Sequence, residues 1–105
     1  MPQFTVYRNK NPKSKTGIPY LLDVQNDLLT QLETRVVIPV FLKKNTRMKV
    51  LTQLTPEFEI EGKKVILMTP QMAGIALEHL GEVIGDLSEH RNEIVGAIDF
   101  LVTGF

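Results

Sequence analysis

Residues 88–105, at the end of the chain, carry hydrophobic residues at helical spacing. Positions i, i+1, i+4, i+7, i+8 and i+11 fall on one face of a helix with 3.6 residues per turn. Ser88 is a suitable N-cap residue and Glu89 places negative charge in the first turn, so the helix is predicted to start near residue 89. Its apolar face consists of Ile94, Val95, Ile98, Leu101, Val102 and Phe105.

The two ends of this apolar face have different expected roles. Ile94, Ile98 and Leu101 lie in regular turns and are predicted to be core residues. Val102 and Phe105 fall where a helix frays, and they suit a contact surface as well as a core. We therefore expect the end of this helix to be offered to a partner.

Apolar runs predict three strands in the first forty residues. Residues 3–7 alternate, with Phe4 and Val6 on one face, and residues 20–25 and 35–40 follow. The last run has no polar residue at 36–38, which predicts burial on both faces. Pro39 interrupts its ladder and predicts a bulge or an edge position. Residues 8–17 are polar and are predicted to form a mobile loop.

The second half of the chain predicts more strands and one short helix. Residues 49–54 form a weak strand candidate, while residues 57–61 and 63–68 are strands that the Glu61-Gly62 turn joins in a hairpin. Thr69 and Pro70 look like the cap and first residue of a short helix over 70–80. The fold class is therefore mainly antiparallel β with a closing C-terminal helix.

Two adjacent leucines stand out in the polar segment 26–34. Leu28 and Leu29 follow one another in a turn-like setting. At least one of them must face outward unless another element covers it.

The chain length of 105 residues indicates a single domain, residues 1–105, with a radius of gyration of about 13 Å. The absence of cysteine excludes disulfides, thiolate metal sites and a cysteine nucleophile. The first nine residues alternate and do not resemble a signal peptide, and no segment resembles a membrane span, so the expected location is the cytoplasm.

The net charge is zero but unevenly distributed along the chain. Residues 1–49 hold nine basic and three acidic groups, and residues 50–105 hold three basic and nine acidic groups. Such asymmetry favours a basic surface only if the two halves do not interleave in the fold. The candidate members of a basic patch are Arg8, Lys10, Lys13, Lys15, Lys43, Lys44, Arg47 and Lys49.

The sequence contains no recognisable catalytic constellation. His79 and His90 stand eleven residues apart without a metal-binding spacing, and no phosphate loop or nucleophile motif is present. Glu57, Glu59 and Glu61 share one face of a strand, which a solvated edge explains better than a carboxylate pair. We expect no catalytic residue, metal or cofactor, and a protein that acts by binding.

Several blocks of the chain resemble the CcdB family of plasmid and chromosomal toxins. Residues 3–7 (QFTVY), 22–29 (LDVQNDLL) and 35–39 (RVVIP) match its first blocks. Met68-Thr69, Met72-Ala73, Gly81-Glu82 and residues 86–88 follow in the family order. The order and spacing together make the resemblance specific over nearly the whole chain.

The resemblance implies a homodimer with an SH3-like barrel-type body, a small extra sheet and a C-terminal helix. Family members poison DNA gyrase by binding its A subunit and trapping the cleavage complex, and a CcdA antitoxin neutralises them. DNA is then met only indirectly, through gyrase or the antitoxin complex. The implied gyrase-binding residues are Leu28, Leu29, Asp99, Val102, Thr103, Gly104 and Phe105, and the candidate antitoxin-binding residues are Arg8, Lys10, Asn11, Lys13 and Lys15.

The chain departs from the family at its end, where Thr103-Gly104-Phe105 replaces the usual Trp-Gly-Ile. Threonine cannot stack as tryptophan does, and we expect Phe105 and the leucine pair to compensate. Two alternatives remain open: a MazF-like endoribonuclease, because MazF toxins share this body, and an inactive or retargeted CcdB homologue.

Overall fold

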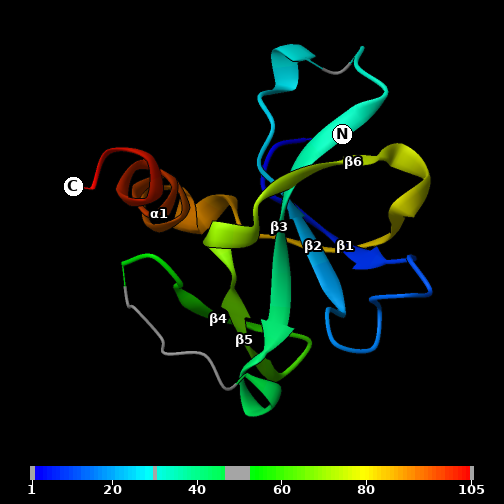
Figure 1. The fold of residues 1–105 in the computed structure, drawn as a ribbon, viewed down its shortest axis with the longest axis horizontal. Helices are drawn as coiled ribbons and strands as arrows, with labels where there is room; N and C mark the ends of the chain where they lie inside the picture. The colour runs from blue at the N-terminus through cyan, green and yellow to red at the C-terminus, as the bar shows by residue number, and fades with distance from the viewer. Residues whose placement is uncertain (1, 30, 47–52, 105) are drawn as a thin grey trace.

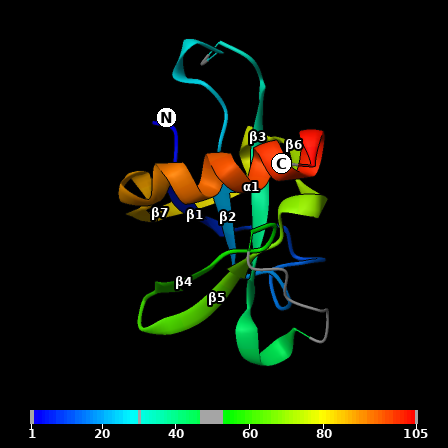
Figure 2. The ribbon, with the colours of Figure 1, turned by 90° about the vertical axis from the view of Figure 1, so that its left-hand side faces the viewer.

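The structure is a computed structural model that describes residues 2–29, 31–46 and 53–104. A curved antiparallel sheet forms a half-barrel, and one helix, α1 (Arg91–Thr103), lies across it (Figures 1 and 2). The main path of the sheet has the order β4-β5-β3-β2-β1-β7, and β6 pairs with β3 off this path. The strands are β1 (Thr5–Asn9), β2 (Tyr20–Asp23), β3 (Thr34–Leu42), β4 (Glu57–Ile60), β5 (Lys63–Leu67), β6 (Ala73–Ala76) and β7 (Leu80–Asp86).

The predicted fold class is confirmed. The chain is mainly antiparallel β with one C-terminal helix, and the expected small extra sheet corresponds to the single strand β6. The radius of gyration is 12.8 Å. No helix among the described residues is long and apolar enough to cross a membrane.

The alternation of side chains along the strands divides the apolar residues between two faces of the sheet. Leu22 belongs to the main core cluster beneath α1, while its neighbour Leu21 belongs to a smaller cluster with Tyr7, Val37 and Leu80. The main cluster comprises Phe4, Val6, Tyr20, Leu22, Ile38, Val40, Ile60, Val65, Leu67, Leu87 and Ile94. The predicted burial of the β3 run on both faces follows from this division.

The predicted hairpin is confirmed in its turn chemistry. β4 and β5 pair from Ile60↔Lys63, and both turn residues have positive φ, 53° at Glu61 and 74° at Gly62. A two-residue turn with two left-handed residues matches the twist of the strands that it joins. The alternating glutamates of β4 lie on the outer edge of the sheet, as a solvated edge requires.

Pro39 lies neither at an edge nor at a bulge, which corrects the prediction. β3 pairs with β2 through Leu21↔Pro39, and on its other side it pairs with β6 at residues 34–37 and with β5 at residues 40–42. The Pro39 carbonyl accepts a hydrogen bond from Met68. Because the N and C=O of one strand residue point the same way, the missing N–H of Pro39 faces the gap between β5 and β6.

The predicted helix over residues 70–80 is wrong. Thr69 and Pro70 start only a short 3-10 turn, η3 (Thr69–Gln71), which is followed by β6, a second 3-10 turn η4 (Leu77–His79) and β7. Among the described residues, β6 is the strand that pairs with residues 34–37 of β3 on this side of the sheet, and this pairing prevails over the local helical signal.

The first loop is held by the hydrogen bonds of one buried side chain. β1 is shifted two residues beyond the predicted segment, and its last residue, Asn9, is buried. The Asn9 side chain donates to Ser14 Oγ at 3.0 Å and to the Ile18 carbonyl at 2.9 Å, and it accepts from Asn11 N–H at 3.0 Å. One asparagine therefore ties the loop together. Of the weak strand candidate 49–54, residues 49–52 lie outside the described residues, and Gln53 and Leu54 form a turn.

The final helix starts later than predicted. A 3-10 turn, η5 (Ser88–His90), precedes α1, and His90 occupies the N-cap position. Ser88 makes no capping bond; its N–H instead donates to Asp86 Oδ1 at 2.6 Å. Leu101 is 39% exposed and is not a core residue, whereas Ala97 is fully buried beside Ile94. α1 thus packs through its first half, and its second half is largely free of the core.

Candidate functional site

The leucine pair lies in a short 3-10 turn, η1 (Asp27–Leu29), at one end of the molecule (Figures 1 and 2). Leu28 is 87% exposed and Leu29 is 49% exposed. Leu32, which the sequence did not single out, is 50% exposed, and its N–H donates to the Leu29 carbonyl at 3.3 Å. Three leucines therefore expose half or more of their surface, or nearly so, within one short segment.

The turn that carries these leucines is closed by its own polar residues. Asn26 accepts twice, from Leu28 N–H at its Oδ1 over 2.8 Å and from Leu29 N–H at its carbonyl over 3.0 Å. Asp27 Oδ1 accepts from Gln3 N–H at 2.7 Å, which fastens the turn to the N-terminal segment. The bond from Leu28 N–H to Asn26 Oδ1 has the Asx-turn geometry that asparagine favours.

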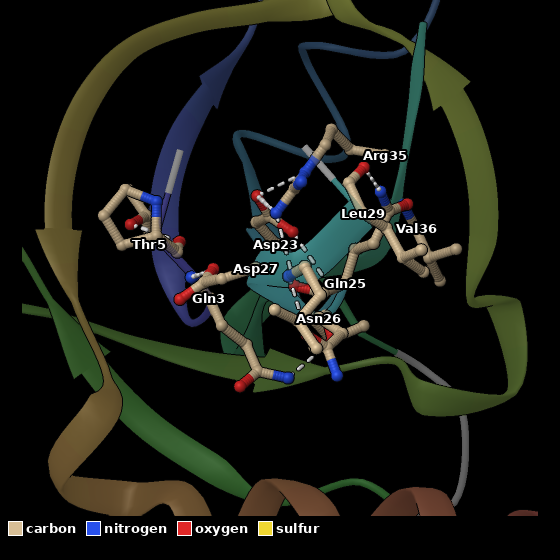
Figure 3. A network of polar contacts seen from close by, with 12 residues as sticks. Gln3, Thr5, Asp23, Gln25, Asn26, Asp27, Leu29, Arg35 and Val36 are labelled. Carbon is tan, nitrogen blue, oxygen red and sulfur yellow. Dashed lines mark hydrogen bonds and ion pairs between the residues drawn. The ribbon is translucent and has the colours of Figure 1, made fainter. Parts of the chain in front are cut away.

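Gln25 fastens the turn to the sheet (Figure 3). Its Nε2 donates to the Leu29 carbonyl at 2.9 Å, and its Oε1 accepts from Val36 N–H at 3.0 Å. The Gln25 residue is only 6% exposed. This role was not predicted from the sequence, because a glutamine at the end of a strand is ordinarily a surface residue.

A buried ion pair lies next to Gln25 (Figure 3). Arg35 donates to Asp23 Oδ2 from Nη2 at 2.8 Å and from Nε at 2.9 Å. Asp23 Oδ1 accepts from Gln25 N–H at 3.0 Å, and Arg35 Nη2 donates to the Gln25 carbonyl at 3.3 Å. Burial raises the pKa of Asp23 above its ordinary value, although the hydrogen bond from Arg35 opposes this rise.

The second group of predicted contact residues lies at the end of α1. Asp99, Val102, Thr103 and Gly104 are all exposed, Val102 by 73%, and Phe105 lies outside the described residues. Gly104 ends the helix in the left-handed region with φ of 79°, and its N–H donates to the Phe100 carbonyl at 2.9 Å. Thr103 Oγ1 donates to the Asp99 carbonyl at 2.7 Å, so its side chain lies against the helix.

The leucine turn and the end of α1 occupy different places on the surface of one chain (Figures 1 and 2). Gln3 nevertheless links η1 to the start of the helix. Its N–H donates to Asp27, and its Oε1 accepts from Arg91 Nη1 at 3.3 Å. Gln3 thus connects the leucine turn to the first residue of α1, whereas the predicted contact residues of α1 lie at its other end.

The candidate antitoxin-binding residues are divided between a strand and the first loop. Arg8 belongs to β1, where it is paired with Glu82 at 2.9 Å and Glu61 at 3.3 Å. Lys10, Lys13 and Lys15 are exposed, and Asn11 Oδ1 accepts from Lys13 N–H at 3.0 Å. The structure therefore brings the loop residues together but has already engaged Arg8 with acidic groups.

The wider basic patch is interrupted by the acidic half of the chain. Lys43 is paired with Glu57 at 3.1 Å, as Arg8 is with Glu61 and Glu82. Arg47 and Lys49 lie outside the described residues. The opposite charges of the two halves are interleaved wherever these pairs form.

His90 contacts an aromatic ring and a carboxylate. His90 packs against Phe58 in a tilted arrangement, with ring centroids 4.7 Å apart and an interplanar angle of 50°, and its Nδ1 contacts Glu93 Oε1 at 3.2 Å. Within residues 2–29, 31–46 and 53–104, no group of three or more His, Asp or Glu side chains is placed to hold a metal ion.

A comparison with family models identifies the chain. The model of the CcdB protein matches residues 3–104. This match includes both the leucine turn and the end of α1, and it selects the binding activity over the endoribonuclease alternative. The chain therefore belongs to the CcdB family, the gyrase-poisoning toxins of CcdA/CcdB toxin–antitoxin systems, which act by binding gyrase and not by catalysis.

Proposed function

We propose that this chain acts as a homodimer that binds the gyrase A subunit through the η1 leucines and the ends of its two α1 helices, and so traps the cleavage complex. The observation that carries the proposal is Leu28, which is 87% exposed on a turn held by hydrogen bonds. A large apolar side chain displayed on a rigid turn suits an interface anchor. The proposed gyrase-binding residues are Leu28, Leu29, Asp99, Val102, Thr103, Gly104 and Phe105.

The free second half of α1 supports the homodimer. Leu101 and Val102 are exposed by 39% and 73%, so the apolar face continues beyond the core of one chain. A two-fold axis beside the helix ends would cover part of this face and place both ends on one surface. Sedimentation at micromolar concentration should give a dimer; a stable, folded monomer would refute this part of the proposal.

The first loop is the proposed binding site for a disordered segment of a CcdA-type antitoxin. Asn11 and Ser14 of this loop line a cavity of about 150 Å³, together with apolar residues that include Leu21, Val37 and Ile75. Lys10, Lys13 and Lys15 belong to the same loop and are exposed. Such a site suits a segment that carries acidic groups and an apolar anchor. Gyrase and the antitoxin are both cytoplasmic, so we assign the same location to this chain, which meets DNA only through these partners.

Affinity for the isolated gyrase A subunit tests the proposed gyrase site. Leu28→Ala and Val102→Ala should each weaken binding at least fivefold, because each removes an apolar contact of the proposed site. Both side chains are exposed, so neither substitution should affect folding much. Val83→Ala on β7 is the matched control, because Val83 is 64% exposed outside the proposed surface. Equal effects of all three substitutions would refute the assignment.

An inactive or retargeted homologue is the second candidate, and Thr103 in place of the family tryptophan favours it. Inducible expression in bacteria separates the candidates. DNA breaks that depend on gyrase support the proposed poison, whereas growth without DNA or RNA damage supports an inactive homologue. Growth arrest without breaks, together with no affinity for gyrase, supports a different target.

A further inference from the structure

Gln25 stands where the pairing of two strands ends. The β2–β3 ladder has its last register pair at Asp23↔Val37, and Gln25 follows two residues later. Its side-chain amide continues the connection, because Oε1 takes the Val36 N–H that a further ladder residue would take. Its Nε2 reaches in the other direction to the Leu29 carbonyl. One amide therefore joins β3 to the leucine turn.

The backbone of Gln25 is held by hydrogen bonds as well as its side-chain amide. The Gln25 N–H donates to Asp23 Oδ1, and the Gln25 carbonyl accepts from Arg35 Nη2. The side chains of Asp23 and Arg35 are 0% and 1% exposed. The backbone that carries the side chain therefore cannot turn away without breaking its hydrogen bonds to a buried ion pair. The position of the Leu29 carbonyl is set through Gln25 by the interior of the protein.

Exposed leucines take little direction from packing. With 87% and 49% of their surfaces exposed, Leu28 and Leu29 depend largely on the backbone of η1 for the direction of their Cα–Cβ bonds. The hydrogen bond from Gln25 to Leu29 connects that backbone to the rigid sheet. An anchor that is oriented before binding loses less conformational entropy when it binds.

We propose that Gln25 is a positioning residue for gyrase binding, which fixes the direction of Leu28 and Leu29 by bridging Val36 of β3 and Leu29 of η1. This inference rests on the proposed gyrase contact of the two leucines. Gln25 itself is 6% exposed and touches gyrase in no step of the proposal.

Gln25→Glu tests the bridge with a minimal change. The carboxylate keeps an acceptor for the Val36 N–H but replaces the donor to the Leu29 carbonyl with an oxygen. Affinity for the gyrase A subunit should fall about tenfold. Amide hydrogen exchange within η1 should accelerate in the free toxin, which is a readout that needs no gyrase. If the buried carboxylate prevents folding, Gln25→Met removes the same donor without adding charge.

Asn9→Asp is the matched control. Asn9 is also a buried amide that donates to a loop carbonyl, that of Ile18, and aspartate likewise keeps its acceptor for Asn11. It braces the first loop, outside the proposed gyrase surface. Asn9→Asp should leave gyrase affinity within about twofold. A loss equal to that of Gln25→Glu would reduce the role of Gln25 to general stability and overturn the inference.

The double variant L28A/L29A separates this inference from the function on which it rests. If L28A/L29A lowers gyrase affinity and Gln25→Glu has no further effect in that background, Gln25 acts through the leucines. If Gln25→Glu has no effect in the native background, or the same effect in both, the positioning role is refuted while the leucine contact stands. If L28A/L29A itself binds gyrase normally, the proposed gyrase contact is refuted first, and the inference with it.

Discussion

Arg35 and Asp23 form an ion pair in the interior of the protein, with 2.8 Å between Nη2 and Oδ2 and side chains that are 1% and 0% exposed. The pair joins the end of β2 to the beginning of β3. Through the backbone of Gln25 it also supports the segment that leads to η1. Losing one partner of this pair should therefore lower the free energy of unfolding more than losing one partner of a surface ion pair.

Removing one partner of this pair should be strongly destabilising. Arg35→Met leaves the Asp23 carboxylate buried without its cation, and we expect a loss of about 3–5 kcal/mol in the free energy of unfolding. Urea denaturation at one fixed protein concentration measures it. The double variant D23N/R35M, which buries no charge, should recover part of the loss. A single-variant cost below about 1 kcal/mol would contradict the prediction.

Gly81 should not tolerate a side chain, whereas Gly85 on the same strand should. A Cβ at Gly81 would lie 2.7 Å from the Arg8 carbonyl oxygen, and a Cβ at Gly85 would meet nothing within 4 Å. We expect Gly81→Ala to cost about 1–3 kcal/mol by forcing β7 away from β1. Gly85→Ala should be neutral or slightly stabilising, since it restricts the unfolded chain. Equal urea midpoints for the two variants would show that β7 adjusts freely.

Stability should fall in alkaline solution because of Tyr20. Burial, and then its hydrogen bond to Glu61, raise the pKa of Tyr20 to about 12, from the ordinary value of 10.0. Its neutral form is thus favoured in the folded state, so its contribution is complete below pH 10 and is lost as pH rises toward 12. A shift of this size corresponds to about 2–3 kcal/mol.

Tyr20→Phe provides the measurement. The variant lacks the hydroxyl that donates to Glu61 at 2.5 Å, so its stability at neutral pH should be lower. Its unfolding free energy should, however, decline less between about pH 10 and about pH 12 than that of the native protein. Tyr7→Phe is the comparison for the second tyrosine, whose pKa is also raised by burial. Parallel pH profiles for the native protein and Tyr20→Phe would contradict the assignment.

The departure at Thr103 can be tested by restoring the family residue. Thr103 is exposed and its hydroxyl donates to a carbonyl of its own helix, so Thr103→Trp should change the unfolding free energy by less than about 0.5 kcal/mol. If the leucines and Phe105 compensate for the missing tryptophan, the larger side chain should weaken gyrase binding at least threefold. Thr103→Ser, which keeps the hydroxyl, should bind normally. Tighter binding by Thr103→Trp would show instead that the anchor is simply missing.

The parts of the fold that were predictable are those whose signals are local. The Glu61-Gly62 turn is predictable from two adjacent residues, and the helical spacing of apolar residues in α1 predicts Ile94 as a core residue. Leu28 and Leu29 were recognisable because two leucines in a polar turn cannot both be buried there without a covering element. Each of these inferences needs only a few neighbouring residues.

The parts that were missed depend on register between distant segments. Asp23 and Arg35 stand twelve residues apart and meet only because β2 and β3 pair with Asp23 opposite Val37. β6 and β7 contain Gly74, Gly81 and Gly85, which argue locally against regular structure. At Gly81 the reason for glycine is the Arg8 backbone, which no local pattern reveals.

The position of Pro39 has a consequence for how the length of this chain can vary. On one side of Pro39 the strand β3 is matched residue by residue to β6, and on the other side to β5, while β2 pairs across both parts. Inserting or deleting one residue within β3 would reverse the facing of side chains on one side of that point relative to the other. Natural insertions and deletions should therefore collect in the connecting loops, and β3 should keep a constant length among relatives of this protein.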